Sequence, residues 1–207
     1  MAELLKATGI YYRNELRSIH KNGVKLQPVY EAFTNSWESI LEKYTAEHLN
    51  LGSIVIEFHY NVGMFEEDNE NNLKNLQKII ITDNGIGLNE ESFTRLLNLR
   101  DNSKSKNNKG TGRIQYLHYF DDTIFESVYK VGDNNFRKIC LTLSKKEAFL
   151  QANAILRKDF DEETDIDKTY AKVELHTILD YKNDAKFYNA LLLSDVKSEL
   201  ITHFLSR

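Results

Sequence analysis

Cysteine, proline and glycine are all scarce in this sequence, with 1 Cys, 1 Pro and 9 Gly in 207 residues. The lone Cys140 excludes an intramolecular disulfide and a cysteine-built zinc site, and it fits a reducing compartment. No segment approaches the roughly 20 apolar residues of a membrane-spanning helix, and the N-terminus lacks the unbroken apolar stretch of a signal peptide. We therefore predict a soluble, cytoplasmic protein with no membrane partner.

An excess of positive charge is also missing, because 27 Lys and Arg stand against 31 Asp and Glu, for a formal net charge of -4. The chain has no overall positive field that would hold nucleic acid, so a nucleic-acid partner is not supported by charge, although a local basic patch stays open. At this length, 41% hydrophobic residues can bury one good core. We predict one domain over residues 1–207.

Hydrophobic periodicity predicts helices and strands that alternate along the chain. Helices are expected at 3–19 (within an N-terminal helical segment 1–25), 28–44, 89–100 with Asn89 as its N-terminal cap, 113–120 and 184–205. Strands are expected at 53–60, 77–82, 123–131, 136–144 and 170–179, with a polar excursion at 159–168. This order predicts an α+β fold, a two-layer sandwich in which helices cover one face of a mixed, mostly antiparallel sheet.

A polar stripe follows one side of the predicted helix 28–44. Glu31, Asn35 and Glu38 are spaced by four and three residues, which places them on the same helical face. Such a stripe is ordinarily the solvated side of an amphipathic helix. Its alternative interpretation, a row of ligand-binding side chains, depends on what the rest of the chain supplies.

The apolar strand 77–82 ends in the run Asp83-Asn84-Gly85-Ile86-Gly87. An ordinary tight turn has the same composition, because Asp and Asn bond their own backbone and Gly accepts positive φ. In the functional interpretation, Asp83 accepts a hydrogen bond from the exocyclic amine of a flat heterocycle. Gly85 and Gly87 then leave room for its ring, and the carboxylate favours adenine over guanine.

A third element begins with Ser103 and Lys104 in a segment without hydrophobic residues, and continues as Lys109-Gly110-Thr111-Gly112-Arg113 into the predicted helix 113–120. Glycines ahead of a helix let backbone N–H groups converge on an anion such as phosphate. The spacing is neither that of the Walker loop nor that of a dinucleotide-binding fold. A solvated loop is the alternative.

In their order and intervals, the three elements resemble the GHKL ATP-binding family, which includes gyrase, the ninety-kilodalton heat-shock chaperones, MutL proteins, MORC ATPases and histidine kinases. The resemblance extends from Val29 to Phe120. It implies the Bergerat ATP-binding fold, with ATP and Mg²⁺ as ligands and a lid over the phosphates at about 101–112.

The resemblance also implies individual roles. Glu31 matches the general base, Asn35 the Mg²⁺ ligand and Asp83 the adenine-reading aspartate. The candidate nucleotide-binding residues are Asn35, Glu38, Asp83, Gly85, Gly87, Ser103, Lys104, Lys109, Gly110, Thr111, Gly112, Arg113 and Thr169.

Two departures from the family pattern affect the phosphate side. Ala171 stands where the family commonly has a threonine, and Thr169, on the same side of an extended chain, is the candidate replacement. Gyrase-like members add a lysine from a following domain, for which this sequence has no counterpart before Arg207. The site is therefore expected to be incomplete.

The function expected from these residues is slow, Mg²⁺-dependent ATP hydrolysis, in which ATP closes the lid and switches self-association or binding of a protein partner. The alternative is a nucleotide-binding module without useful hydrolysis, either a fragment of a larger ATPase or a degenerate sensor. A histidine-kinase catalytic domain is less favoured, because the segment before Glu31 is too short for the two long helices that carry a phosphorylated histidine.

Overall fold

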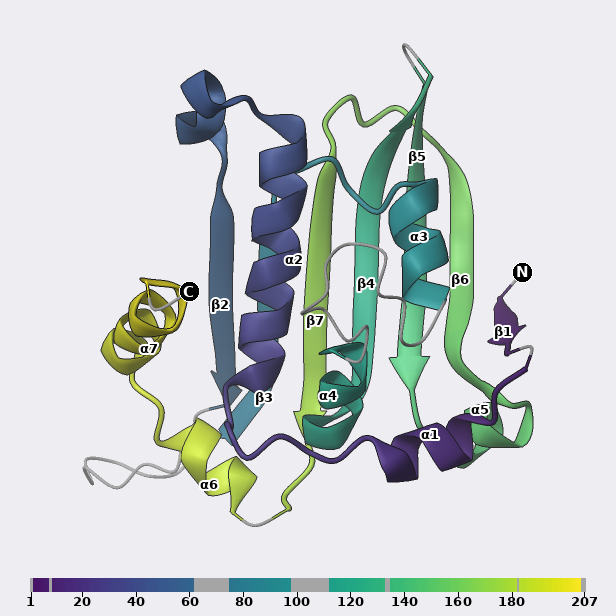
Figure 1. Ribbon diagram of the computed structural model, residues 1–207, viewed down its shortest axis with the longest axis vertical. Helices are drawn as coiled ribbons and strands as arrows, with labels where there is room; N and C mark the ends of the chain where they lie inside the picture. Colours follow the sequence, from purple (N-terminus) through teal and green to yellow (C-terminus); the bar gives the residue numbers. More distant parts are fainter. Residues whose placement is uncertain are drawn as a thin grey trace.

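The fold is built on one sheet of seven strands, seen in the computed structural model of Figure 1, which describes residues 2–7, 9–61, 75–97, 112–132, 135–181 and 183–205. The strand order is β1-β6-β5-β4-β7-β3-β2. The strands are β1 (Glu3–Lys6), β2 (Ile54–Asn61), β3 (Asn75–Asp83), β4 (Phe120–Val131), β5 (Asn135–Ser144), β6 (Ala154–Thr164) and β7 (Tyr170–Ile178). Every pairing between these strands is antiparallel, which corrects the predicted mixed sheet.

Helices α2, α3 and α4 lie against one face of this sheet (Figure 1). The helical elements are α1 (Tyr12–Ser18), α2 (Gln27–Lys43), the 3-10 helix η1 (Ala46–Leu51), α3 (Glu90–Leu97), α4 (Gly112–Tyr119), α5 (Glu147–Gln151), α6 (Asp184–Asn189) and α7 (Leu193–Leu205). The structure is α+β, as predicted, and its layers are compatible with the predicted two-layer sandwich.

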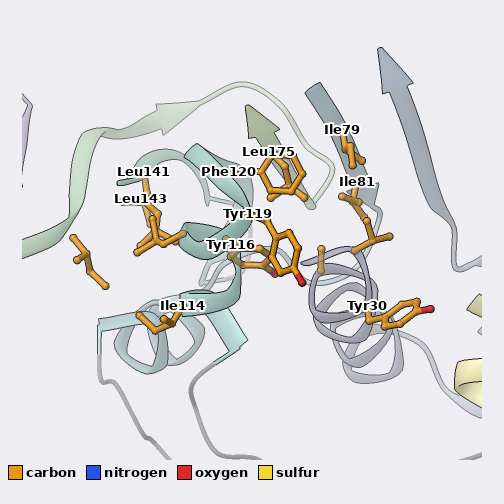
Figure 2. Packing of buried hydrophobic residues seen from close by; sticks show 14 of the residues in the cluster. Tyr30, Ile79, Ile81, Ile114, Tyr116, Tyr119, Phe120, Leu141, Leu143 and Leu175 are labelled. Atoms are coloured by element: carbon orange, nitrogen blue, oxygen red, sulfur yellow. The ribbon is translucent and has the colours of Figure 1, made fainter. Parts of the chain in front are cut away.

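The core lies between the sheet and α2 and α4, where Figure 2 shows side chains of β3, β5 and β7 converging on those of the helices. Strand residues alternate between the two faces of a sheet, so Ile79 and Ile81 of β3 both point into the core, and both are fully buried. Helix α2 starts with Pro28 in its first turn, where a missing N–H has no cost. Its buried side includes Val29 and Ala32.

The predicted N-terminal helix 3–19 is wrong in its first half. Glu3–Lys6 is strand β1, which pairs with β6, and only Tyr12–Ser18 is helical. The strand β6 was itself missed, because its outer half is polar and was interpreted as an excursion at 159–168. Strand β1 is stabilised by pairing with β6, far away in the sequence, and the polar outer half of β6 is stabilised by pairing with β5; local periodicity reports neither pairing.

The predicted C-terminal helix 184–205 is two helices, α6 and α7, with a break at residues 190–192. The remaining predicted helices and strands occur close to their expected positions. Asn89 caps α3 as predicted, with its side-chain oxygen accepting from Ser92 N at 2.9 Å.

The opposite face of the sheet carries a row of alternating charges, which we call the charged ladder. It comprises Lys78 on β3, Glu174 and Lys172 on β7, Glu126 on β4 and Lys138 on β5. Successive members form ion pairs of 3.0 to 3.2 Å. Cross-strand pairs of opposite charge stabilise such a sheet face.

Among the described helices, none has both the length and the apolar composition needed to cross a membrane.

Candidate functional site

A cavity of about 220 Å³ lies between α2, the sheet and the facing ends of α3 and α4. Its walls contain parts of all three sequence elements: from α2 Glu31, Asn35, Ser36, Glu38 and Ser39, from the end of β3 Asp83, Ile86 and Gly87, and from α4 Gly112 and Arg113. The fold therefore brings together side chains that are far apart in the sequence.

Asp83 lies at one end of the cavity, beside Ser36 and Ser39 of α2. It is the last residue of β3, only 4% exposed, and its Oδ1 accepts from Gly85 N at 2.9 Å. Burial raises the pKa of the Asp83 carboxyl, while hydrogen bonds from Gly85 N and the hydroxyls of Ser36 and Ser39 lower it in part. Asp83 is thus a buried acceptor held in one orientation by α2 and its own turn.

The glycines after Asp83 are required by the protein's own packing. A Cβ at Gly85 would collide with Ser39, including its backbone carbon at 2.7 Å, so Gly85 allows α2 to approach the turn closely. Gly87 has φ +79, and a Cβ there would collide with the Val128 carbonyl. Gly87 lines the cavity. Gly85 is not one of its lining residues and contributes by letting α2 pack against the turn.

The other end of the cavity is built around Glu31 and Asn35, one turn apart on α2. Gln27 Nε2 donates to Glu31 Oε1 at 2.7 Å. The Cα of Gly112 faces the same carboxylate, since a Cβ there would lie 2.7 Å from Glu31 Cδ. Gly112 is the first residue of α4, so the Glu31 carboxylate lies at the N-terminal end of that helix.

Tyr116 of α4 lies behind these two residues and is 1% exposed. Burial raises the pKa of its hydroxyl, the Glu31 carboxylate raises it further, and the Asn35 side chain lowers it. The hydroxyl has no partner of ordinary hydrogen-bond geometry within the described residues. Tyr116 therefore remains a neutral phenol that packs behind the Glu31 and Asn35 side chains.

A divalent cation at this end would have Asn35 as its protein ligand. Within the described ranges, no group of three or more His, Cys, Asp or Glu side chains could hold a metal by itself. Mg²⁺ is commonly bound by one or two protein oxygens together with substrate phosphates and water. The exposed Asn35 amide beside Glu31 fits that arrangement.

Arg113 and Arg95 bring positive charge to the cavity wall. Arg113 Nη1 donates to the carbonyls of Arg95, at 2.8 Å, and Leu96, and so caps the C-terminal end of α3. Arg95 Nη2 donates to Ser92 Oγ at 2.9 Å. Arg113, predicted as a phosphate contact, thus also joins the two helices.

Thr169 lies against the turn after β3. It is not among the described residues that line the cavity; its hydroxyl donates to Gly85 O at 2.6 Å and accepts from Lys43 Nζ at 2.8 Å. Ala171 lines the cavity and is paired with Asp83 across the sheet. Thr169 therefore supports the turn after β3 and lies outside the described lining of the cavity.

Some predicted site residues lie outside the described residues: Ser103, Lys104, Lys109, Gly110 and Thr111.

Other residues were missed, namely Gln27, Ser36, Ser39, Arg95 and Tyr116. For Gln27 the signal was present, because it precedes Glu31 by one helical turn. Ser36 and Ser39 carry no motif and are identified only by the approach of α2 to the turn after β3.

Comparison with models of known protein families gives no match to this sequence, and comparison with curated proteins gives no similar sequence. The chemistry of the site is therefore argued from its own residues.

Proposed function

We propose that the protein binds ATP with Mg²⁺ and hydrolyses it slowly, on a sheet and helices that form the Bergerat ATP-binding fold. One observation carries the proposal: a single cavity has the buried Asp83 carboxylate at one end and the Glu31–Asn35 pair, beside the start of α4, at the other. This order of groups along α2 suits a ligand with a base at one end and phosphates at the other.

The Asp83 end suits an adenine ring. Apolar groups of Ile86, Leu88, Phe125, Ala171 and Val173 line the wall. A flat ring can pack between such groups while its exocyclic amine donates to Asp83. Adenine offers that amine, whereas guanine presents a carbonyl oxygen at the corresponding position, so the carboxylate selects adenine.

The Glu31 end suits the phosphates. The N-terminal turn of α4 offers backbone N–H groups and the positive end of the helix dipole, and Arg95 and Arg113 add positive charge. Asn35 would hold Mg²⁺, which when bound neutralises phosphate charge.

The proposed reaction requires one proton transfer to the protein. Water attacks the γ-phosphorus, the Glu31 carboxylate accepts the proton from that water, and the bond from the γ-phosphorus to the bridging oxygen breaks to release ADP and phosphate. Gly112 leaves space for the carboxylate at this position.

Binding and hydrolysis are tested separately. We expect MgATP to raise the melting temperature, by an amount equivalent to about 2.7 kcal/mol at a hundredfold excess over the dissociation constant. MgGTP should have a smaller effect, and Asp83→Asn should abolish the MgATP effect. Glu31→Ala should keep MgATP affinity and lose phosphate release. A wild type that binds ATP and never releases phosphate, even when concentrated, would support the alternative of a binding module.

The proposal extends to a cytoplasmic setting and to ATP-dependent self-association or partner binding. The predicted lid at about 101–112 falls almost entirely outside the described residues and stays a prediction.

A further inference from the structure

Gln27 is the first residue of α2 and lies one helical turn before Glu31. Its Nε2 donates to Glu31 Oε1 at 2.7 Å, within the range of a strong, charge-assisted hydrogen bond. A carboxylate can only accept, so the NH₂ group of Gln27 must face Glu31 and its carbonyl oxygen must face away.

Asn22 occupies that other side. Its Nδ2 donates to Gln27 Oε1 at 3.1 Å, and its own Oδ1 accepts from Val24 N at 2.9 Å. Each amide group therefore has one orientation that satisfies its hydrogen bonds. In that orientation Asn22 donates to Gln27, and Gln27 donates to Glu31.

The segment that carries Asn22 is in turn attached to α4. Asn22 N donates to Gln115 Oε1 at 2.8 Å, and the Tyr119 hydroxyl donates to Asn22 O. Gln115 is 8% exposed, and its Nε2 donates to His20 O at 3.1 Å. The helix whose first residue contacts the Glu31 carboxylate thus also anchors the residues that orient it.

We propose that Gln27 is a positioning residue for the Glu31 carboxylate, with Asn22 fixing the orientation of the Gln27 amide. This inference rests on the proposed function. A neutral amide suits this role, because it fixes one carboxylate oxygen without placing a full positive charge against a group that must accept a proton. Gln27 itself does not line the cavity. Its loss affects the reaction through Glu31, and nucleotide contacts remain.

The test compares Gln27→Met with Gln77→Met. Methionine keeps the length of the side chain and removes the donor. Gln77 is an exposed control on β3 whose amide lies 3.5 Å from Asn75 O. Steady-state phosphate release gives kcat, and calorimetry gives the dissociation constant for MgATP. We expect Gln27→Met to lower kcat about 10- to 100-fold with the dissociation constant within about twofold, as for a misplaced reacting group. Gln77→Met should change neither quantity.

Two further measurements separate positioning from folding. Asn22→Ala should lower kcat in the same way and by a smaller factor, because Gln27 then keeps its donor and loses its fixed orientation. In the NMR spectrum, Glu31→Gln should shift the Gln27 side-chain amide protons, because it removes the charged acceptor of their hydrogen bond.

An unchanged kcat in Gln27→Met overturns the inference and leaves the proposed function intact. Parallel losses of kcat, MgATP affinity and melting temperature also overturn it, since they indicate a structural role. A wild type with neither MgATP binding nor phosphate release instead contradicts the proposed function, and the inference with it.

Discussion

At the scale of single residues, the buried carboxylate of Asp83 serves the proposed binding of adenine at a cost in stability. Asp83 is buried, and its three hydrogen-bond donors only partly offset the effect of burial on its pKa. A carboxyl whose folded-state pKa is raised stabilises the fold less as pH rises from its ordinary value of 3.8 through the raised value. Ionisation of Asp83 therefore lowers stability while it offers the acceptor that adenine needs.

We expect Asp83→Asn to keep or raise the melting temperature of the nucleotide-free protein at neutral pH, because it removes a buried charge while retaining an acceptor for Gly85 N. The same variant should lose the stabilisation by MgATP. Thermal unfolding with and without MgATP measures both effects. A variant still stabilised by MgATP as strongly as the wild type would contradict the role of Asp83.

Gly112→Ala tests the other end of the cavity. The added Cβ would meet the Glu31 carboxylate, the end of a flexible side chain, and not backbone. We expect the carboxylate to shift and kcat to fall about tenfold or more. Folding should be retained, because alanine is the better helix former by about 1 kcal/mol. Gly23→Ala is the matched control, since nothing lies within 4 Å of the added Cβ. Equal kcat in both variants would contradict the placement of Glu31.

At the scale of elements, the N-terminal segment is attached to the sheet through the turn before β6. Asn153 Nδ2 donates to Ile10 O at 2.9 Å, and its Oδ1 accepts from Tyr12 N at 3.1 Å. Asn153 has φ 52, in the left-handed region that asparagine tolerates. These bonds join β1, α1 and β6 at one point.

We expect Asn153→Ala to lower the free energy of unfolding by about 1–3 kcal/mol, because two backbone groups lose their partners. Asn153→Gly relieves the strain of the left-handed backbone conformation without restoring the two hydrogen bonds. The difference between the losses in Asn153→Ala and Asn153→Gly therefore gives the contribution of backbone strain. Denaturant unfolding measures both variants. The MgATP-induced rise in melting temperature should be unchanged, since Asn153 does not line the cavity.

At the scale of the whole molecule, the two faces of the sheet are stabilised differently, one by apolar burial under helices and the other by the charged ladder. Glu174 is central to the ladder. Burial raises its pKa, but hydrogen bonds from Lys78, Lys172 and His176 outweigh burial and lower it from 4.5 to about 2. A lowered folded-state pKa contributes stability above the ordinary value and loses it as pH falls.

Wild-type stability should therefore decrease as pH is lowered from 4.5 to about 2, and Glu174→Gln should be less stable at neutral pH with a flatter dependence in that interval. Glu163→Gln, at an exposed position on β6, is the control. Denaturant unfolding across this pH range measures the difference. Identical pH profiles for the two variants would contradict the ladder's contribution.

Prediction from the sequence succeeded where local pattern and local structure agree. The apolar face of α2, the strand before Asp83 and the cap at Asn89 each depend on residues within a few positions of one another. It failed for β1 and β6, whose pairing joins the two halves of the chain. The place of Thr169 also depends on tertiary contacts, because its hydroxyl bonds Gly85 O and Lys43 Nζ of α2.

The sequence by itself determined the spacing of Glu31 and Asn35 on one helical face and the acidic turn after an apolar strand, because both follow from backbone periodicity. Only the tertiary structure decided that these groups share one cavity, that Ser36 and Ser39 bond Asp83, and that the Glu31 carboxylate faces Gly112. The physical reason is that such contacts depend on how closely α2 packs against the turn after β3 and the start of α4. That distance is set by the whole core and by no single segment.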